Sequence, residues 1–318
     1  MDIAGAPLYN ARVSEPLTAP IRATTRLCAV FGHPIGHSAS PAMQNAGIAA
    51  LGLDWRYVAC EVHPDRLREG IAGAQAMKFI GLNLTVPHKL LAVDLVDALD
   101  HSAKTWGAVN TIRFEAQDSS GAWRSLREFP EATPERIRSH GFNTDADAIT
   151  RSLREELRFE PAGAKVLLLG AGGAGRTAAL KLASDRVAEL HLVNRTAAKA
   201  EALAAEIRER FSAVKVCTGY PQGDVDLALN ATSLGLRPTD TLPLDAREFS
   251  LTRANAVYDM IYRPAETPLL AAARAAGCRV ANGLGMLLYQ GAAALELWTG
   301  RNAPIEVMRE ALQRSVYG

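Results

Sequence analysis

The spacing that most directly indicates chemistry in this 318-residue sequence is a glycine-rich turn between a predicted strand and a predicted helix. Residues 166–169 are apolar and predict a buried strand of a parallel sheet, and residues 176–183 are rich in Ala and Leu and predict a helix. Between them, Gly170, Gly172 and Gly175 have G-x-G-x-x-G spacing. The first glycine permits a tight turn, the second permits approach of a pyrophosphate, and the third permits close helix–strand packing. The helix N-terminus adds free N–H groups and partial positive charge, so this stretch predicts a dinucleotide site.

The residues after the next predicted strand, 189–193, indicate which dinucleotide binds. An NAD site usually places an acidic residue there for the ribose 2′-hydroxyl. Here Arg195 occupies that region, Thr196 is beside it and Lys199 follows one turn later. Because a guanidinium binds a 2′-phosphate in a fork and stacks on adenine, we predict NADP(H) and not NAD. The predicted cofactor contacts from these two segments are Gly170, Ala171, Gly172, Gly173, Ala174, Asn194, Arg195, Thr196 and Lys199.

Four fragments in the first half of the chain place polar side chains at predicted strand ends or helix starts. They are residues 37–41 (HSASP), 83–89 (NLTVPHK), 107–110 (GAVN) and 143–145 (NTD). Ligands of α/β proteins bind at such positions, so these fragments predict a substrate site.

Together with the glycine turn and residues 283–290 (GLGMLLYQ), these fragments resemble the shikimate dehydrogenase family, from about Arg26 to the C-terminus. The resemblance implies reversible reduction of 3-dehydroshikimate to shikimate by NADPH. It also implies that Lys89 and Asp145 are the catalytic residues. Hydride addition to a ketone creates an alkoxide, which a nearby ammonium group stabilises and protonates. A carboxylate partner would keep that ammonium charged and oriented.

The resemblance further assigns contacts to the substrate and the nicotinamide. Ser38 and Ser40 would hold the carboxylate of the cyclohexene acid. The ring hydroxyls and remaining substrate contacts would fall to Thr85, Asn110, Asp145, Tyr262 and Gln290, and the nicotinamide would be lined by Met260 and Gly283. Simpler interpretations stay open: Ser40 and Asp145 also fit helix N-caps, Asn110 fits a turn, and Met286 fits a helix core.

Three features depart from the family pattern. Ala146 follows the Asn-Thr-Asp fragment where the family usually has glycine, and His101 stands where the family often has an acid. The segment 115–140 is longer than the family's hairpin, and we expect a long hairpin or surface excursion there. His33 and His37 have no third ligand in the sequence, so no metal site is predicted.

The alternation of predicted strands and helices indicates an α/β protein of two domains. We expect an N-terminal extension at 1–25, a parallel-type α/β substrate domain at 26–145, a Rossmann domain at 146–283, and C-terminal helices at 284–318 that return to the first domain. In the first domain the predicted strands are 26–31, 55–61, 79–86 and 108–114, and the predicted helices are 41–51, 64–76, 89–98 and 101–106. A linking helix is predicted at 146–157, and the later strands at 215–218, 227–230, 256–259 and 279–281. The later helices are predicted at 197–211, 267–276 and 304–316.

Composition narrows the class of protein and its partners. The net charge of +1 without a basic run gives no reason to expect nucleic acid or an acidic membrane surface. No apolar run approaches the length of a membrane span, and no signal peptide is evident. Four scattered cysteines indicate free thiols and predict a cytoplasmic protein. The expected partner is a small-molecule substrate, and the sequence leaves monomer and homodimer open.

Two other functions stay open at this stage. One keeps the chemistry but takes quinate or an aminoshikimate as substrate; the Ser38–Ser40 pair and Thr85 favour shikimate, and Arg195 disfavours NAD. The other is a non-catalytic NADP-binding module on the same fold. The presence of both Lys89 and Asp145 argues against it, because a sensor needs neither.

Overall fold

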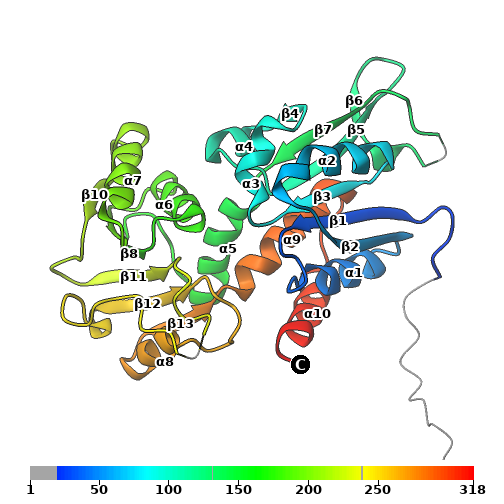
Figure 1. Ribbon diagram of the computed structural model, residues 1–318. Helices are drawn as coiled ribbons and strands as arrows, with labels where there is room; N and C mark the ends of the chain where they lie inside the picture. Colours follow the sequence, from blue (N-terminus) through cyan, green and yellow to red (C-terminus); the bar gives the residue numbers. More distant parts are fainter. Residues whose placement is uncertain (1–19, 131, 238) are drawn as a thin grey trace, which may run out of the picture.

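The computed structural model describes residues 20–130, 132–237 and 239–318, and these form two α/β lobes (Figure 1). Helices α5 (Asp145–Leu157) and α9 (Leu284–Thr299) lie between the lobes. Most of the predicted N-terminal extension, residues 1–19, lies outside the described residues. Residues 20–25 lead into the first strand, and the hydroxyls of Thr24 and Thr25 donate to Asp54.

The first lobe is built on three parallel strands. They are β1 (Arg26–Gly32), β2 (Trp55–Glu61) and β3 (Gly81–Leu84), paired in the order β2-β1-β3. The central strand β1 and its neighbour β3 are largely buried. Helices α1 (Ser40–Ala50) and α2 (Leu67–Ala76) connect them, as parallel strands require. These elements confirm the predicted start of the domain, although β3 is shorter than the predicted 79–86.

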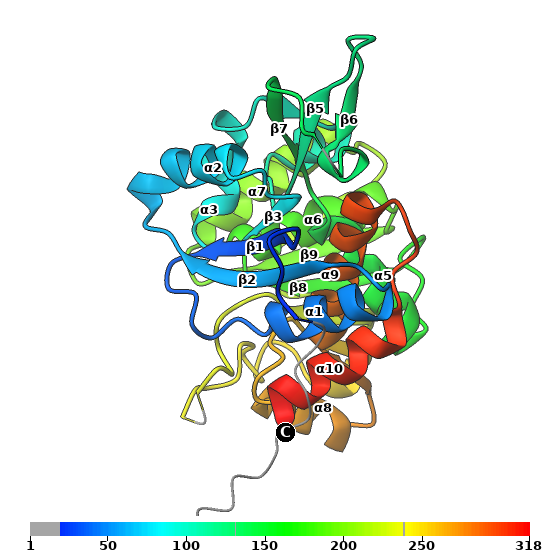
Figure 2. The same cartoon turned by 90° about the vertical axis from the view of Figure 1, so that its right-hand side faces the viewer.

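The remaining strands of this sheet run in both directions. Strand β5 (Thr111–Gln117) is antiparallel to β3 and to β7 (Ile137–Phe142), and β6 (Trp123–Ser125) pairs with β5. The 115–140 segment is therefore the expected hairpin, which projects from one end of the molecule (Figure 2). Strand β7 was not predicted, and the expectation of parallel strands does not extend to β5, which is antiparallel to both of its neighbours. The described residues between β5 and β7 form β6 and a 3₁₀ turn (Leu126–Glu128) and contain no α-helix, so the chain returns as an antiparallel hairpin.

The predicted helix at 89–98 is wrong beyond its first turns. Helix α3 (His88–Leu91) is followed by one 3₁₀ turn (Ala92–Asp94) and by β4 (Ala98–Leu99), which pairs with β7. The carboxylate of Asp97 accepts hydrogen bonds from the backbone and hydroxyl of Ser139, at 2.7 and 2.8 Å. These long-range bonds draw the segment onto the sheet and override its helical pattern. Helix α4 (His101–Trp106) then forms as predicted.

The second lobe is a parallel sheet in the order β10-β9-β8-β11-β12-β13. Its strands are β8 (Lys165–Leu169), β9 (Glu189–Val193), β10 (Lys215–Thr218), β11 (Val225–Asn230), β12 (Ala254–Asp259) and β13 (Arg279–Asn282). In chain order this is 3-2-1-4-5-6, the strand order of the Rossmann fold. All six predicted strands are confirmed.

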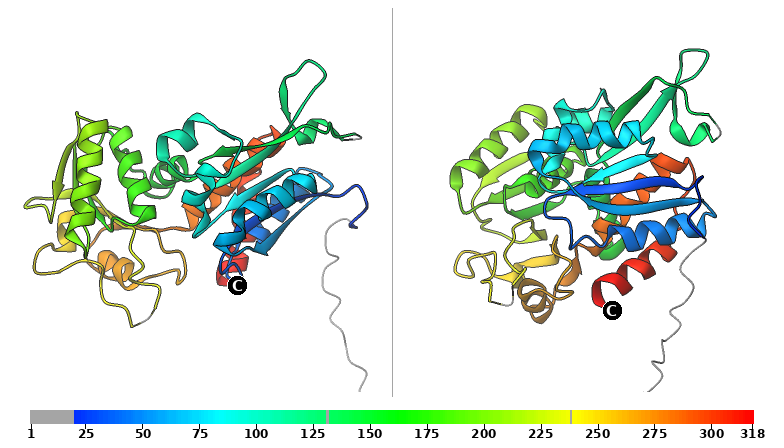
Figure 3. Two further views of the ribbon diagram at one scale, coloured as in Figure 1. Left: turned by 45° about the horizontal axis from the view of Figure 1, so that its top comes forward. Right: turned by 45° about the vertical axis from the view of Figure 1, so that its right-hand side comes forward.

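Helices cover both faces of the second sheet. Helices α6 (Gly173–Ser184) and α7 (Ala197–Arg210) share one apolar core with Val166 and Leu168, and α8 (Pro268–Ala275) shares another with Leu167 and Leu169. Figure 3 shows these helices on opposite sides of the strands. Burial on both faces explains why residues 166–169 are continuously apolar.

The last two helices pack on the first lobe. Helix α10 (Ile305–Tyr317) lies against α1, and Trp298 of α9 is fully buried with its indole N–H donating to the carbonyl of Ile112 at 3.0 Å. A Cβ at Gly47 of α1 would lie 2.8 Å from the Leu295 side chain, so the small residue permits close packing of α1 on α9.

Two further expectations concern membranes and cysteines. Within the described ranges, no helix combines the length and apolarity that crossing a bilayer requires. Cys28 and Cys278 are buried free thiols, and Cys60 and Cys217 are half-buried free thiols. Burial raises the pKa of Cys60, which keeps this thiol protonated and unreactive.

A buried charge cluster joins β5 to β7. Glu115 is 1% exposed, and its carboxylate accepts hydrogen bonds from Arg113, Arg138 and His140. Burial alone would raise the pKa of Glu115, but the hydrogen bonds from His140, Arg113 and Arg138 outweigh it and lower the pKa to about 2. Because this is below the carboxyl's ordinary value, Glu115 stabilises the fold above pH 4.5 and loses that contribution as the pH falls toward 2.

We therefore expect Glu115→Gln to lower the free energy of unfolding by about 3 kcal/mol at pH 7, because it removes the buried carboxylate that pairs with the half-buried guanidinium groups of Arg113 and Arg138. The difference from the wild type should shrink between pH 4.5 and pH 2, as measured by urea unfolding at each pH. Glu266→Gln, which removes an exposed ion pair with Arg274, is the control and should change stability little. A pH-independent effect of Glu115→Gln would contradict this account.

Candidate active site

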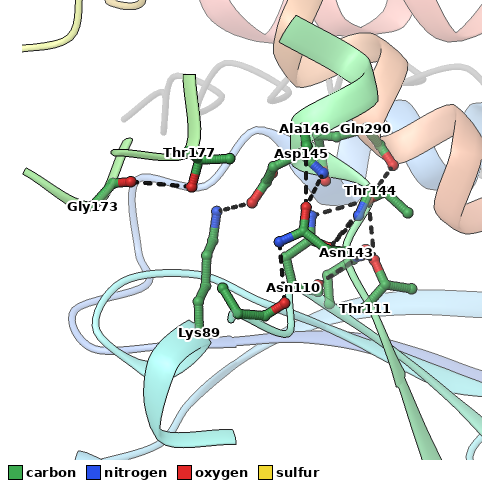
Figure 4. A network of polar contacts seen from close by, with 12 residues as sticks. Lys89, Asn110, Thr111, Asn143, Thr144, Asp145, Ala146, Gly173, Thr177 and Gln290 are labelled. Carbon is green, nitrogen blue, oxygen red and sulfur yellow. Dashed lines mark hydrogen bonds and ion pairs between the residues drawn. The ribbon is translucent and has the colours of Figure 1, made fainter. Parts of the chain in front are cut away.

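Lys89 and Asp145 meet although they lie in different elements. The Lys89 Nζ is 2.7 Å from the Asp145 Oδ2 (Figure 4). Lys89 is the second residue of the single-turn helix α3, and Asp145 is the first residue of α5. The side chains are 33% and 10% exposed, so the ammonium reaches a cavity while the carboxylate is largely enclosed. The carboxylate stands at the N-terminus of α5, where a negative charge is electrostatically favourable.

The Asp145 carboxylate does not serve as the cap of its helix. Instead, the Asn143 Oδ1 accepts hydrogen bonds from the backbone N–H groups of Asp145 and Ala146, at 3.1 and 3.2 Å. The alternative interpretation of Asp145 as an N-cap is therefore wrong, and its carboxylate is available to Lys89. Ala146 is fully buried inside α5, where alanine is favourable, so this departure from the family pattern fits the helix.

A cavity of about 340 Å³ opens beside this ion pair, with walls from both lobes. Its volume suits a small polar ligand. The predicted substrate and nicotinamide residues on its walls are Ser38, Ser40, Thr85, Lys89, Asp145, Met260, Tyr262, Gly283 and Gln290. Burial raises the pKa of Tyr262, so its phenol stays neutral and able to donate a hydrogen bond.

Neither Ser38 nor Ser40 uses its side chain to cap helix α1. Ala39 is the cap residue of α1 and no side chain caps this helix, so the interpretation of Ser40 as an N-cap is wrong. The backbone N–H of Ser40 lies 3.4 Å from the Ser38 Oγ. Both serines line the first cavity, Ser38 in the loop before α1 and Ser40 as the first residue of α1.

Asn110 is not on the wall of this cavity. It is 1% exposed; its Oδ1 accepts from the backbone N–H of Thr144 at 2.8 Å and its Nδ2 donates to the Thr144 Oγ1 at 3.0 Å. The Thr144 hydroxyl in turn lies 3.1 Å from the carbonyl oxygen of Gln290. Asn110 thus supports the turn before Asp145 from behind. Neither Thr144 nor Asn143 was predicted as a site residue, although both stand in the Asn-Thr-Asp fragment.

A second cavity of about 320 Å³ adjoins the first at Lys89 and Asp145. It is bounded by Pro87 and Leu90 on one side and by Gly173, Ala174 and Thr177 of the glycine loop on the other. Met286 of α9 packs against the apolar cores of both lobes, as its helix-core interpretation expects, and it also lines both cavities. The ion pair therefore lies where a cavity of polar side chains meets a cavity that runs to the dinucleotide loop.

The glycine loop has the geometry that its spacing predicts. Gly170 has a φ of +106°, which favours glycine, and a Cβ at Gly175 would lie 2.1 Å from the Gly170 carbonyl oxygen. A Cβ at Gly172 would meet nothing within 4 Å, so this residue faces open space. The Asn194 Oδ1 accepts from the Ala171 N–H at 3.0 Å and braces the loop against the end of β9. These features fit the binding of a pyrophosphate at the start of α6.

The basic residues after β9 are free to bind an anion. Arg195 and Lys199 are exposed and form no ion pair within the part of the chain that the structure describes. The Thr196 hydroxyl does not cap α7, although Thr196 is its cap residue. The donor set of Arg195, Thr196 and Lys199 fits a phosphate, as the 2′-phosphate of NADP requires.

The turn after β12 carries Met260 and Tyr262, and Gly283, which follows β13, donates its N–H to the Ile261 carbonyl in that turn. The buried Asp259 carboxylate accepts hydrogen bonds from the Asn230 side chain at 2.9 Å, the Ile261 N–H at 3.1 Å and the Thr267 hydroxyl at 2.6 Å. A Cβ at Gly283 would lie 2.0 Å from the Met260 carbonyl oxygen, so the two backbones touch and only glycine fits there. This contact holds the cavity wall that the sequence assigns to the nicotinamide.

Two histidine predictions have clear outcomes. His101 is an exposed residue of α4, with its Nε2 3.3 Å from the Thr105 Oγ1, and lines neither cavity. The His33 Nδ1 lies 3.0 Å from the Glu61 carboxylate and its ring packs edge-on against His63, whereas His37 lines the first cavity. His33 and His37 therefore make contacts with different groups.

Comparison with known proteins independently supports the family that the sequence motifs indicate. Three sequence families match in order: the shikimate dehydrogenase substrate binding domain at residues 30–112, shikimate / quinate 5-dehydrogenase at 153–222, and the shikimate 5′-dehydrogenase C-terminal domain at 283–313. The shikimate dehydrogenase (NADP(+)) of Methanopyrus kandleri is 39% identical, over 93% of this chain and 98% of that protein. That of Moorella thermoacetica is 42% identical, over 93% and 95%.

A solved structure agrees with these relatives. A crystal structure of a shikimate dehydrogenase in complex with NADP+ superimposes with a TM-score of 0.81 at 35% identity, covering 96% of this chain and all of that one. The chain belongs to the shikimate dehydrogenase family, and the predicted two-domain α/β fold is confirmed.

The position of Arg195 gives a test of cofactor choice. Arg195→Ala should raise the Kd for NADP roughly tenfold or more, because a hydrogen-bonded charge pair with the 2′-phosphate is lost. The Kd for NAD, which lacks that phosphate, should change little. Titration calorimetry with both dinucleotides checks this, with the exposed Arg247→Ala in the same lobe as control. Equal weakening of NADP and NAD would contradict the assignment.

Proposed function

We propose that this chain interconverts 3-dehydroshikimate and shikimate with NADPH and NADP+, using Lys89 as the proton donor and acceptor. The observation that carries the proposal is the Lys89–Asp145 pair at the junction of the two cavities, in a member of this family. One cavity supplies polar groups for a hydroxylated acid, and the other reaches the glycine loop.

When bound, NADPH supplies the hydride that reduces the C3 ketone. The Lys89 ammonium stabilises the negative charge that develops on the substrate oxygen and donates its proton to that oxygen. Asp145 remains a carboxylate throughout and orients the ammonium from 2.7 Å. Because Lys89 is one-third exposed, its amine regains a proton from solvent. In the oxidative direction, neutral Lys89 accepts the proton of the C3 hydroxyl.

Substrate recognition follows from the walls of the first cavity. Ser38 and Ser40 hold the carboxylate with two hydroxyl donors, and Thr85, Tyr262 and Gln290 face the ring hydroxyls together with Asp145. Asn110 could contact a ring hydroxyl only if its amide gave up its hydrogen bonds to Thr144. Those hydrogen bonds therefore favour a supporting role for Asn110, in which it holds Thr144 in place.

The cofactor assignments rest on the second lobe. Gly170 to Ala174 cradle the pyrophosphate, and Met260 and Gly283 line the nicotinamide position. The 2′-phosphate is held by Arg195, Thr196 and Lys199, while Asn194 braces the loop.

We also propose the domain boundaries and a cytoplasmic location. We keep a substrate domain at 26–145, an NADP domain at 146–283 and returning helices at 284–318, which is supported by the packing of α10 on α1. Free half-buried thiols at Cys60 and Cys217 suit the reducing cytoplasm. NADPH use suits the reductive direction, within the biosynthesis of aromatic amino acids through chorismate.

Initial rates with shikimate and quinate, each with NADP and NAD, test the function directly. We expect the highest kcat/KM with shikimate and NADP, because the basic group after β9 matches the 2′-phosphate. A higher kcat/KM for quinate would make the chain a quinate dehydrogenase. Binding of NADP without turnover of either acid would indicate the non-catalytic module.

Lys89→Ala tests the chemical role. It should lower kcat by about 10²- to 10⁴-fold, the range for loss of a general acid–base group. The KM for shikimate should change far less, because the hydroxyl and carboxylate contacts stay in place. Steady-state kinetics in both directions measure this, and unchanged NADP binding is the control for folding. A loss confined to KM would assign Lys89 to substrate binding alone.

A further inference from the structure

We infer that Asn143 is a positioning residue of this active site, because its side chain joins the backbone at Asp145 to the Ala108–Val109 segment, which is itself hydrogen-bonded to the backbone of Lys89. The inference rests on the proposed roles of those two residues. Asn143 is 4% exposed, lies in the turn between β7 and α5, and lines neither of the two cavities. Figure 4 shows its amide bonded to the backbone at the start of α5, while the Asp145 carboxylate meets the Lys89 ammonium.

The oxygen of the Asn143 side chain fixes the backbone at Asp145. It accepts the N–H groups of Asp145 and Ala146 and so fills the capping role at the start of α5. A short carboxylate at this place would otherwise compete for the free N–H groups of its own helix. With those donors satisfied, the Asp145 carboxylate points outward and meets the Lys89 ammonium.

The nitrogen of the same side chain fixes the Ala108–Val109 segment, which lies beside Lys89. The Asn143 Nδ2 donates to the carbonyl oxygen of Ala108 at 3.1 Å. The next residue, Val109, donates its backbone N–H to the carbonyl oxygen of Lys89 at 2.8 Å. The amide therefore fixes the peptide that anchors α3, and Ala108 itself lines the cavity that contains the ion pair.

Both halves of the amide are needed for this bridge. Asparagine offers an acceptor oxygen and a donor nitrogen on one short side chain. Aspartate would keep the cap but place a second acceptor against the Ala108 carbonyl. Alanine would lose both contacts. The Asn143 backbone is itself held, because its N–H donates to the Ser102 Oγ at 2.8 Å.

The test compares Asn143→Ala and Asn143→Asp with Asn45→Ala. Asn45 also bridges two segments of the first lobe, donating to the carbonyls of Pro41 and Tyr57, but it contacts neither catalytic segment. Asn143→Ala should lower kcat about 100-fold, the cost of a displacement of roughly 1 Å at a reacting group. Asn143→Asp, which keeps the cap and so the helix, should also lower kcat. In both variants the KM for NADP should stay near the wild-type value, and Asn45→Ala should leave kcat near the wild-type value.

A double-mutant cycle separates positioning from general damage to the fold. In the Lys89→Ala background, Asn143→Ala should reduce the remaining rate by less than about twofold, since no ammonium is left to align. If the two losses multiply, or if Asn45→Ala lowers kcat as much as Asn143→Ala does, the inference is overturned.

Backbone amide exchange provides a readout that does not depend on turnover. Asn143→Ala should accelerate hydrogen exchange at the amides of Val109 and Asp145, and Asn45→Ala should not. A wild-type protein that fails to oxidise shikimate with NADP would overturn the proposed function, whereas unchanged exchange at Val109 would overturn the bridge itself.

Discussion

The contact between the Lys89 ammonium and the Asp145 carboxylate requires two remote segments to end at the same point of one sheet. The strand directions meet this requirement. Strand β5 runs antiparallel to β3 and β7, so its first residue, Thr111, pairs with Asn83 near the end of β3 and with Phe142 at the end of β7. One edge of the sheet therefore gathers two strand ends and one strand start. Polar side chains from three distant parts of the chain meet there, and the enclosed pair follows from that arrangement.

The second lobe faces this edge of the first sheet with the switch point of its own strand order. The order of its strands changes direction between β8 and β11, and such switch points leave a crevice at the carboxyl ends of the strands. The glycine loop follows β8, and the turn held by Asp259 follows β12. Because Met260 and Gly283 touch through their backbones, this turn is rigid where it faces the first lobe. A hydride and a proton can thus reach one carbonyl carbon and its oxygen from two independently built surfaces.

The sequence predicted those parts whose residue types have a single structural meaning. Gly170 and Gly175 require positive φ or close backbone contact, and the apolar run at 166–169 needs burial on both faces; both predictions hold. Strands of two or three residues, such as β4 and β6, are too short for periodicity, and the β7 sequence (IRSHGF) mixes polar residues with its apolar ones. The roles of Asn143 and Asp145 could not be separated beforehand, because either residue caps a helix well. Likewise, Asn110 has the same hydrogen-bonding groups whether it faces a ligand or Thr144.

Lys89, the proposed proton donor, is positioned more by its surroundings than by its own helix. Helix α3 has only four residues, and a helix of one turn has almost no stability alone. A cation near a helix N-terminus also gains nothing from the helix dipole. Its place is set by hydrogen bonds to residues outside the helix: the His88 N–H donates to the carbonyl of Thr85 just after β3, and the Lys89 carbonyl accepts from Val109 before β5, each at 2.8 Å. Since these neighbours are themselves fixed by the sheet, the position of the Lys89 side chain depends on β3, β5 and β7 together, and the local sequence around Lys89 alone could not predict it.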